Sequence, residues 1–189
     1  MSTDPVVIVA ARRTPIGAFQ GAFSDVSATE LGATAVAAAV ADSGVEPADF
    51  GRVLMGCVLP AGLGQAPARQ AALGGGLPKG VPCATVNKMC GSGMEALVLA
   101  HDMVVAGSVG IAVAGGLESM TNAPYLMPKA RKGYRMGHQE VLDHMFWDGL
   151  QDTYEGHMMG HYAEATSQKY GFTREDQDAF AIESVTRAT

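Results

Sequence analysis

The sequence predicts an α/β fold in which a largely parallel sheet carries helices against its faces. Short apolar runs alternate with Ala-rich segments that have helical spacing, and glycines separate many of them. Strands that alternate with helices imply right-handed crossovers and therefore parallel neighbours. Of the 189 residues, 48% are hydrophobic and 17% are charged, so the chain has enough apolar material for a substantial core.

The expected elements follow in a regular order. Residues 6–11 (VVIVAA) read as a strand that is buried on both faces. Residues 28–43 are Ala-rich and precede Gly44, which predicts a helix with a C-terminal glycine stop. We expect further strands at residues 52–59, 81–87 and 109–114, and further helices at residues 66–73 and 93–106. The helix at residues 93–106 is rich in small residues, so we expect it to be buried all round in a layered domain.

The composition changes after Glu118. Residues 119–154 carry many Met, Pro, Gly and basic residues, which predicts an excursion with long loops. Two helices are expected after it, at residues 160–170 and 173–189.

We therefore expect a sheet domain at residues 1–120 and a partial second domain at residues 121–189. The last helical pattern is still in register at Thr189, with no Gly or Pro to close it. This favours the interpretation that the chain is a truncated piece of a larger protein.

Composition also bounds the class of protein. The net charge of −6 argues against a nucleic-acid binder. No apolar run is long enough to span a bilayer, and the N-terminal segment has its charges in the reverse order of a secretory signal. We therefore expect a soluble, cytoplasmic protein. In such a compartment the three cysteines should be reduced thiols.

The most informative stretch is residues 81–100, VPCATVNKMCGSGMEALVLA. It predicts a strand, a tight turn and a helix, with Cys90 at the turn. The N–H groups and the positive dipole end of a helix favour a negative charge, which suits a nucleophilic sulfur. Gly91 and Gly93 would let the backbone turn sharply and let a ligand approach. Cys57 and Cys83 lie in apolar runs and read instead as small core residues.

Two familiar nucleophile motifs do not fit. A nucleophile elbow needs glycine two residues before the nucleophile, and Lys88 occupies that position. The papain-type signature needs a second cysteine and an aromatic residue, where this chain has Gly93 and Met94.

Two weaker candidates remain open at this point. His157 and His161 have the spacing of a metal-binding pair on one helix face. No third ligand is clear, and nearby glycines weaken the helix, so we expect no metal. The basic segment at residues 128–138 (PKARKGYRMGH) could bind a phosphate, but we favour a solvated or interface loop.

The residues around Cys90, VNKMCGSGMEAL, closely resemble the segment around the acyl-accepting cysteine of thiolases, the acetyl-CoA acetyltransferase family. Other thiolase-like motifs follow in the family's order along the whole chain. They are residues 11–17 (ARRTPIG), 114–120 (AGGLESM) and 147–150 (WDGL), then Met159-Gly160 and Ala163-Glu164.

The resemblance implies a thiolase-like layered fold, with the first sheet domain and part of the inserted loop domain present. It implies that Cys90 accepts an acyl group from acyl-CoA and passes it to a second acetyl-CoA, giving acetoacetyl-CoA, or runs the reverse thiolysis. Leu150, Met158 and Met159 would contact coenzyme A. Coenzyme A thioesters would be substrates, with no permanently bound cofactor, and the intact protein would be a homodimer or homotetramer.

The sequence also departs from the family pattern. Thiolases place an activating histidine in a Gly-His-Pro segment, a second cysteine in a Cys-x-Gly-Gly segment and an asparagine in an Asn-Glu-Ala segment, and none of these appears here. Many members have a histidine where Met158 lies, with His157 one position earlier in this chain. Two alternatives therefore stay open: a non-catalytic half-thiolase that binds a partner or an acyl-CoA, and a ketoacyl synthase-like condensing enzyme.

Overall fold

A computed structural model of the chain describes residues 6–188. Its contacts divide into two compact units, which meet in the sequence between Gly149 and Leu150. The domain boundary expected after residue 120 stays a prediction. In the structure, that residue precedes a β-hairpin within the first unit.

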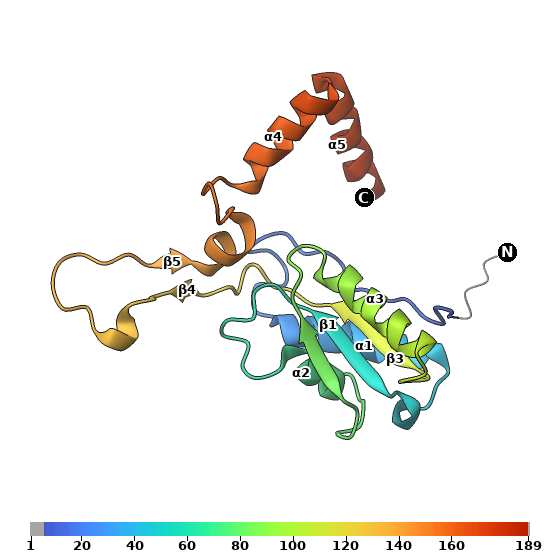
Figure 1. The fold of residues 1–189 in the computed structure, drawn as a ribbon. Coiled ribbons are helices and arrows are strands. Elements are labelled where there is room, and N and C mark those ends of the chain that lie inside the picture. The colour runs from blue at the N-terminus through green and yellow to red at the C-terminus, as the bar shows by residue number, and fades with distance from the viewer. Residues whose placement is uncertain (1–5, 189) are drawn as a thin grey trace. The chain divides into compact units, whose positions relative to one another are not determined.

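The first unit is built on a parallel sheet with the strand order β2-β1-β3 (Figure 1). Its strands are β1 (Arg52–Gly56), β2 (Cys83–Val86) and β3 (Ala112–Gly116). The central strand pairs Val53 with Cys83 on one side and Leu54 with Ala114 on the other. The expected parallel sheet is thus confirmed for these three strands, each shorter than, or shifted from, the apolar run that predicted it.

Helices cover both faces of this sheet. Val53 and Met55 of β1 point to one face, where they share a core with α1 (Ala28–Ser43) and α2 (Pro67–Gly74). Leu54 points to the opposite face and packs against Ala96 and Ala100 of α3 (Ser92–Val105). This alternation is the period of two expected of a strand that is buried on both faces.

Local signals explain the limits of α1. Ser27 and Glu30 form a capping box at its start, in which the Ser27 hydroxyl accepts from the Glu30 backbone N–H and the Glu30 carboxylate accepts from the Ser27 N–H. Gly44 ends the helix with φ = 67°, a left-handed conformation that glycine adopts without strain. The 3-10 turn η1 (Pro47–Asp49) then leads into β1.

Helix α3 differs from its expectation. It buries a single stripe of small residues, Ser92, Ala96 and Ala100, against the sheet. Its other side is exposed and apolar, with the side chains of Met94, Leu97, Val98, Leu99 and Val105 open to solvent. The small residues therefore permit close packing on β1 and β3, but the described chain has nothing that covers the outer face.

The expected strand at residues 6–11 is wrong. This segment belongs to no strand, and Val7, Ile8 and Val9 are 75%, 78% and 61% exposed. An apolar run indicates a segment that tends to be buried, whereas a strand exists only where a neighbouring strand supplies hydrogen bonds. The sheet of β2, β1 and β3 does not include this segment.

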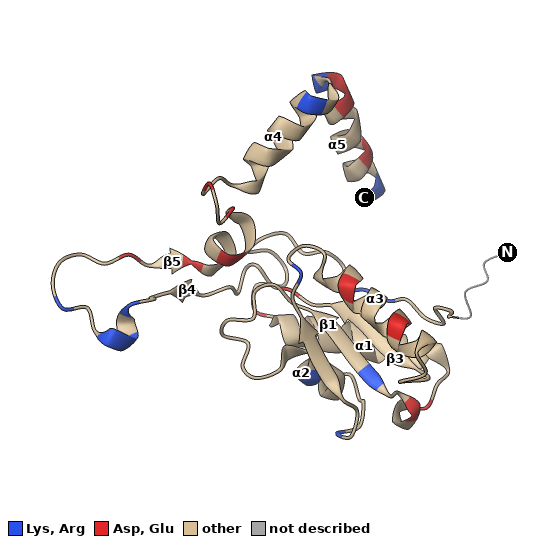
Figure 2. Ribbon diagram, viewed as in Figure 1, with Lys and Arg blue, Asp and Glu red and all other residues tan. Residues whose placement is uncertain are grey.

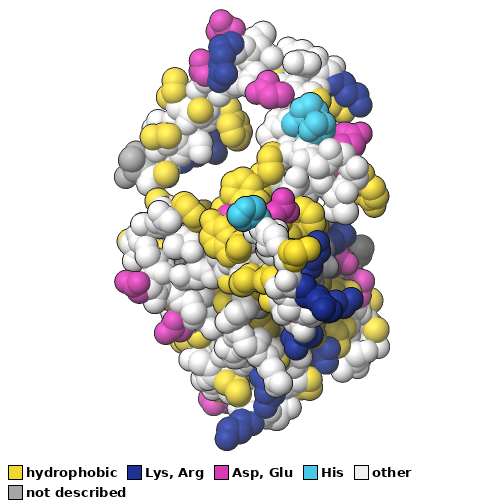
Figure 3. All heavy atoms as spheres, turned by 90° about the vertical axis from the view of Figure 1, so that its left-hand side faces the viewer, with side chains coloured by type: hydrophobic (Ala, Val, Ile, Leu, Met, Phe, Trp, Pro, Cys, Tyr) yellow, Lys and Arg dark blue, Asp and Glu magenta, His cyan; other side chains and the backbone are white. Residues whose placement is uncertain are grey.

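The excursion after the sheet is a long β-hairpin. Its paired strands are short, β4 (Tyr125–Leu126) and β5 (Leu142–Asp143), and the connection between them contains the turn η2 (Ala130–Lys132). Basic side chains gather on this connection, all of them exposed (Figures 2 and 3). They are Lys129, Arg131, Lys132 and Arg135. The single-turn helix η3 (Phe146–Leu150) follows the hairpin.

The second unit contains the two expected helices, α4 (Met159–Tyr170) and α5 (Arg174–Ala188). Gly171 ends α4 with φ = 70°. Thr173 starts α5 by exchanging hydrogen bonds with Asp176, which lowers the pKa of that carboxyl. Across the residues that the structure describes, every helix is too short or too polar to cross a membrane.

Candidate active site

Cys90 lies at the edge of the sheet where the strands end. The strands are parallel, so the carboxyl ends of β1, β2 and β3 meet at one edge. Cys90 follows β2 at this edge, four residues after Val86, and is separated from α3 by the N-cap residue Gly91. In open α/β sheets the carboxyl edge is the usual place for ligands, so the topology puts this thiol where chemistry is expected.

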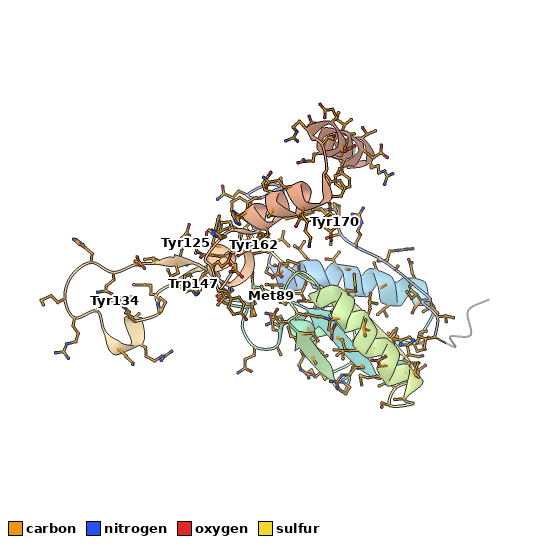
Figure 4. All side chains as sticks on the ribbon, turned by 45° about the horizontal axis from the view of Figure 1, so that its top comes forward. Met89, Tyr125, Tyr134, Trp147, Tyr162 and Tyr170 are labelled. Carbon is orange, nitrogen blue, oxygen red and sulfur yellow. The ribbon has the colours of Figure 1, made fainter. Side chains whose placement is uncertain are left out.

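The turn that carries Cys90 contains one strained residue, Met89, whose φ is +49° (Figure 4). For a residue other than glycine this left-handed conformation costs about 1–2 kcal/mol. Gly91, by contrast, has φ = −89°. The sequence suggested that Gly91 and Gly93 make the turn, but Met89 takes the left-handed position.

Ser92 closes this turn from the helix side. Its hydroxyl accepts a hydrogen bond from the Lys88 backbone N–H at 2.8 Å and donates one to the Met89 carbonyl oxygen at 2.6 Å. Three further bonds support the turn. The Met89 N–H donates to the Asn87 side-chain oxygen, the Gly91 N–H to the Lys88 carbonyl and the Ser92 N–H to the Met89 carbonyl. Ser92 itself is only 4% exposed.

Close backbone approach seats the start of α3 on the strand ends. A Cβ placed on Gly56 would lie 2.5 Å from the Ser92 carbonyl carbon and 2.6 Å from the Gly93 nitrogen, closer than real Cβ contacts. A Cβ on Gly93 would meet only ordinary contacts at 3.8 Å, from Gly115 and Gly116. The glycine that the packing requires at this edge is therefore Gly56.

Lys88 and Glu95 form an ion pair beside the turn, with Nζ and Oε2 2.6 Å apart. The Lys88 side chain is 67% exposed, so water screens the attraction and the pair adds little stability. Lys88 lies two residues before Cys90 in the sequence, and Glu95 balances its charge.

Glu118 holds the loop that follows β1. Its carboxylate accepts hydrogen bonds from the backbone N–H groups of Val58 (2.8 Å) and Leu59 (3.0 Å). The Cys57 thiol donates to the same carboxylate at 3.5 Å. Burial, and then the negative charge of Glu118, raises the pKa of the Cys57 thiol to about 12. Cys57 is therefore a neutral core thiol, as its apolar context predicted.

All three cysteines are free thiols, and they differ in accessibility. Cys57 is buried and Cys83 is half-buried at the start of β2. Burial raises the pKa of the Cys83 thiol, although the positive charges of Arg69 and Arg52 oppose this. Cys90 is exposed, and within the described residues its sulfur has no hydrogen-bond partner. Cys90 is thus the thiol that a solvent-borne electrophile can reach.

The residues expected to contact coenzyme A lie in the second unit. Leu150 is its first residue and the last of η3. Met158 pairs with Gln151 in an isolated bridge and precedes α4, which begins at Met159. Their role in binding coenzyme A stays a prediction.

The two histidines of the candidate pair are close in space. The rings of His157 and His161 stack with centroids 4.1 Å apart. Within residues 6–188, no group of three or more His, Cys, Asp or Glu side chains could hold a metal ion. Stacked rings also lie face to face, whereas two ligands of one ion direct their nitrogens at a common point.

Comparison with known proteins identifies the class. Residues 6–189 match the family model described as "Thiolase, N-terminal domain". The chain therefore belongs to the thiolase family.

Curated relatives agree with this assignment. Proteins named "Probable acetyl-CoA acyltransferase" from Staphylococcus aureus strains COL, MRSA252 and NCTC 8325 are each 48% identical over 183 residues. The match covers 97% of this chain and 47% of each relative. The chain thus spans about half the length of the curated relatives it matches.

Three residues of this site were not expected from the sequence. Nothing in the sequence predicts a left-handed backbone at Met89, because this conformation is uncommon for residues other than glycine. Ser92 read as one small residue among several. Gly56 lies in an apolar run that predicted only a strand. The role of Gly56 depends on how α3 meets β1, which is a tertiary contact, whereas Met89 and Ser92 act through the geometry of the turn before α3.

Proposed function

We propose that the protein transfers acyl groups between coenzyme A thioesters through an acyl-enzyme on Cys90. The observation that carries the proposal is the position of this thiol. It is exposed at the start of α3, on the carboxyl edge of a parallel sheet, in a chain that belongs to the thiolase family.

In the first step the Cys90 thiolate attacks the carbonyl carbon of an acyl-CoA. The bond from that carbon to the coenzyme A sulfur breaks, and coenzyme A leaves and takes up a proton. The product is a thioester on Sγ, which retains the reactivity of the substrate thioester. The Cys90 backbone N–H, at the start of α3, is the group we assign to the negative oxygen of the tetrahedral intermediate.

In the second step a second acetyl-CoA loses a proton from its methyl carbon. The resulting enolate carbon attacks the acyl carbon on Cys90, and the bond from that carbon to Sγ breaks. The products are a 3-ketoacyl-CoA, acetoacetyl-CoA when the acyl group is acetyl, and the free Cys90 thiolate. The reverse sequence is thiolytic cleavage. The resemblance assigns the groups that move these protons to segments absent from this sequence.

The substrate side of the proposal concerns the second unit. We assign contacts with the pantetheine part of coenzyme A to Leu150, Met158 and Met159, which offer an apolar surface to its carbon chain. The two methionines are unbranched and adaptable, so they suit a flexible ligand. Coenzyme A enters as substrate and product, and the active assembly is a homodimer or homotetramer.

The test is acetyl transfer to a defined cysteine. The complete gene product that contains this sequence is incubated with acetyl-CoA, digested and analysed by mass spectrometry. We expect one acetyl group on the peptide that carries Cys90, and none on the peptides of Cys57 and Cys83. The matched control is Cys83→Ser, which should retain acetylation, whereas Cys90→Ser should abolish it.

The alternatives give other results. A protein that binds acyl-CoA without chemistry would show coenzyme A binding but no acetyl group on Cys90. A ketoacyl synthase-like enzyme would load from an acyl-carrier protein and not from acetyl-CoA. Either result, with Cys90 still open to iodoacetamide, would overturn the proposal.

A further inference from the structure

We propose that Ser92 is a positioning residue for the Cys90 nucleophile, which it aims by holding Met89 in its left-handed conformation. This inference rests on the proposed function. It names a group that does not touch the substrate and acts through the turn before the helix.

The Ser92 hydroxyl does not make the hydrogen bond that a serine at the start of a helix usually makes. A capping serine accepts from an N–H inside the first turn of its helix. Helix α3 has no side-chain cap, and its N-cap residue is Gly91. The Ser92 hydroxyl reaches backwards instead, to the Lys88 N–H and the Met89 carbonyl.

These two bonds enclose the strained residue. The Lys88 N–H and the Met89 carbonyl lie on either side of the Met89 φ angle of +49°. Because a single hydroxyl accepts from the Lys88 N–H and donates to the Met89 carbonyl, it fixes the position of one group relative to the other. Ser92 is 4% exposed, so water does not compete well for either bond.

Two backbone bonds also bracket Met89 and would remain in Ser92→Ala: the Gly91 N–H donates to the Lys88 carbonyl at 3.1 Å, and the Ser92 N–H donates to the Met89 carbonyl at 3.0 Å. Neither binds the Lys88 N–H, which the Ser92 hydroxyl holds. Asn87 accepts from the Met89 N–H, on one side of the residue only. The Lys88–Glu95 ion pair joins side chains on the exposed surface. Without the hydroxyl, we expect Met89 to relax towards the right-handed or extended conformations that most residues prefer.

Relaxation of Met89 would redirect Cys90, which is the next residue. A nucleophile displaced by about 1 Å can lose about 100-fold in rate. We therefore expect Ser92→Ala to slow acetylation of Cys90 by about 10- to 100-fold at saturating acetyl-CoA. The KM for acetyl-CoA should change little, because the hydroxyl contacts backbone and not substrate.

The experiment measures the rate of Cys90 acetylation in the complete gene product by rapid quenching and mass spectrometry. Ser27→Ala is the matched control, because it removes a serine hydroxyl that caps α1 and accepts from the Glu30 N–H. It should lower stability but leave both the acetylation rate and the KM unchanged.

A second pair of variants tests the turn itself. Glycine adopts the left-handed conformation without strain, so Met89→Gly should restore much of the rate lost in Ser92→Ala. Met89→Val keeps the hydroxyl but disfavours positive φ, so it should reproduce the loss in kcat. It also gives a result if Ser92→Ala does not fold.

The outcomes separate the two proposals. If folded Ser92→Ala acetylates Cys90 at the wild-type rate, the role of Ser92 is overturned and Cys90 remains the nucleophile. If Ser92→Ala does not fold, a wild-type rate in Met89→Val has the same meaning. A loss that appears only as a higher KM would also overturn it. Absence of the acetyl group from wild-type Cys90 would overturn both.

Discussion

Gly56, the last residue of β1, lies directly against Ser92, the first residue of α3. A Cβ at position 56 would come within 2.5 Å of the Ser92 carbonyl carbon. The strand end and the helix start are therefore in backbone contact, and this contact fixes the start of the helix that follows the Cys90 turn.

This contact predicts that Gly56→Ala destabilises the protein by about 1–3 kcal/mol, because the added methyl group must displace α3 or β1. The same change should slow alkylation of Cys90, since the displacement moves its turn. Urea unfolding and the rate of iodoacetamide labelling would measure the two effects. Gly93→Ala is the control: its Cβ meets nothing closer than 3.8 Å, so it should be nearly neutral in both measurements.

The Cys57 thiol predicts a loss of stability in alkaline solution. Its pKa rises from 9.0 to about 12 on folding, so the folded state keeps a proton that the unfolded state releases. The stabilisation is complete below pH 9 and is lost as the pH rises from about 9 towards 12. Unfolding free energies measured across this window should fall more steeply for the wild type than for Cys57→Ala. Equal slopes would contradict the prediction.

Glu118→Gln should destabilise the loop after β1 by about 1–3 kcal/mol. The carboxylate accepts from both the Val58 and Leu59 N–H groups, one on each oxygen. An amide offers one oxygen and turns its NH₂ group towards the other donor, which leaves a buried N–H without an acceptor. Chemical unfolding measures the loss. Glu140→Gln, on the exposed hairpin, removes the same charge and should have no effect.

The exposed side of α3 predicts self-association of the 189-residue chain when it is expressed alone. Leu97 and Val98 are 47% and 49% exposed in an apolar stripe that includes Met94 and Val105. Sedimentation velocity should show concentration-dependent association that Val98→Lys reduces. Gln168→Lys adds the same charge on α4 and should leave association unchanged. If the chain sediments as a monomer at every concentration, the apolar stripe does not drive self-association.

The regular elements were largely predictable because their causes are local. The Ala-rich pattern and Gly44 predicted α1, and apolar runs between glycines predicted β1, β2 and β3. The run at residues 6–11 has the same local character, yet it forms no strand, because strand formation depends on a hydrogen-bonded neighbour that no local pattern supplies. The sequence could report that this segment is apolar, but not what it pairs with.

The candidate site divides in the same way. The sequence by itself pointed to Cys90 as the candidate nucleophile, since a cysteine between an apolar run and a glycine-rich helix start is a local feature. The ordered motifs around it indicated the family that comparison confirmed. Only the tertiary structure decided how Cys90 is held. Met89 takes the strained position, and the Ser92 hydroxyl binds on either side of it, over four and three residues of sequence. These bonds are short in sequence, but the residue types do not show that this serine turns back to the turn instead of capping its helix. Gly56 lies against Ser92 although the two are distant in sequence, and no local pattern encodes such a contact.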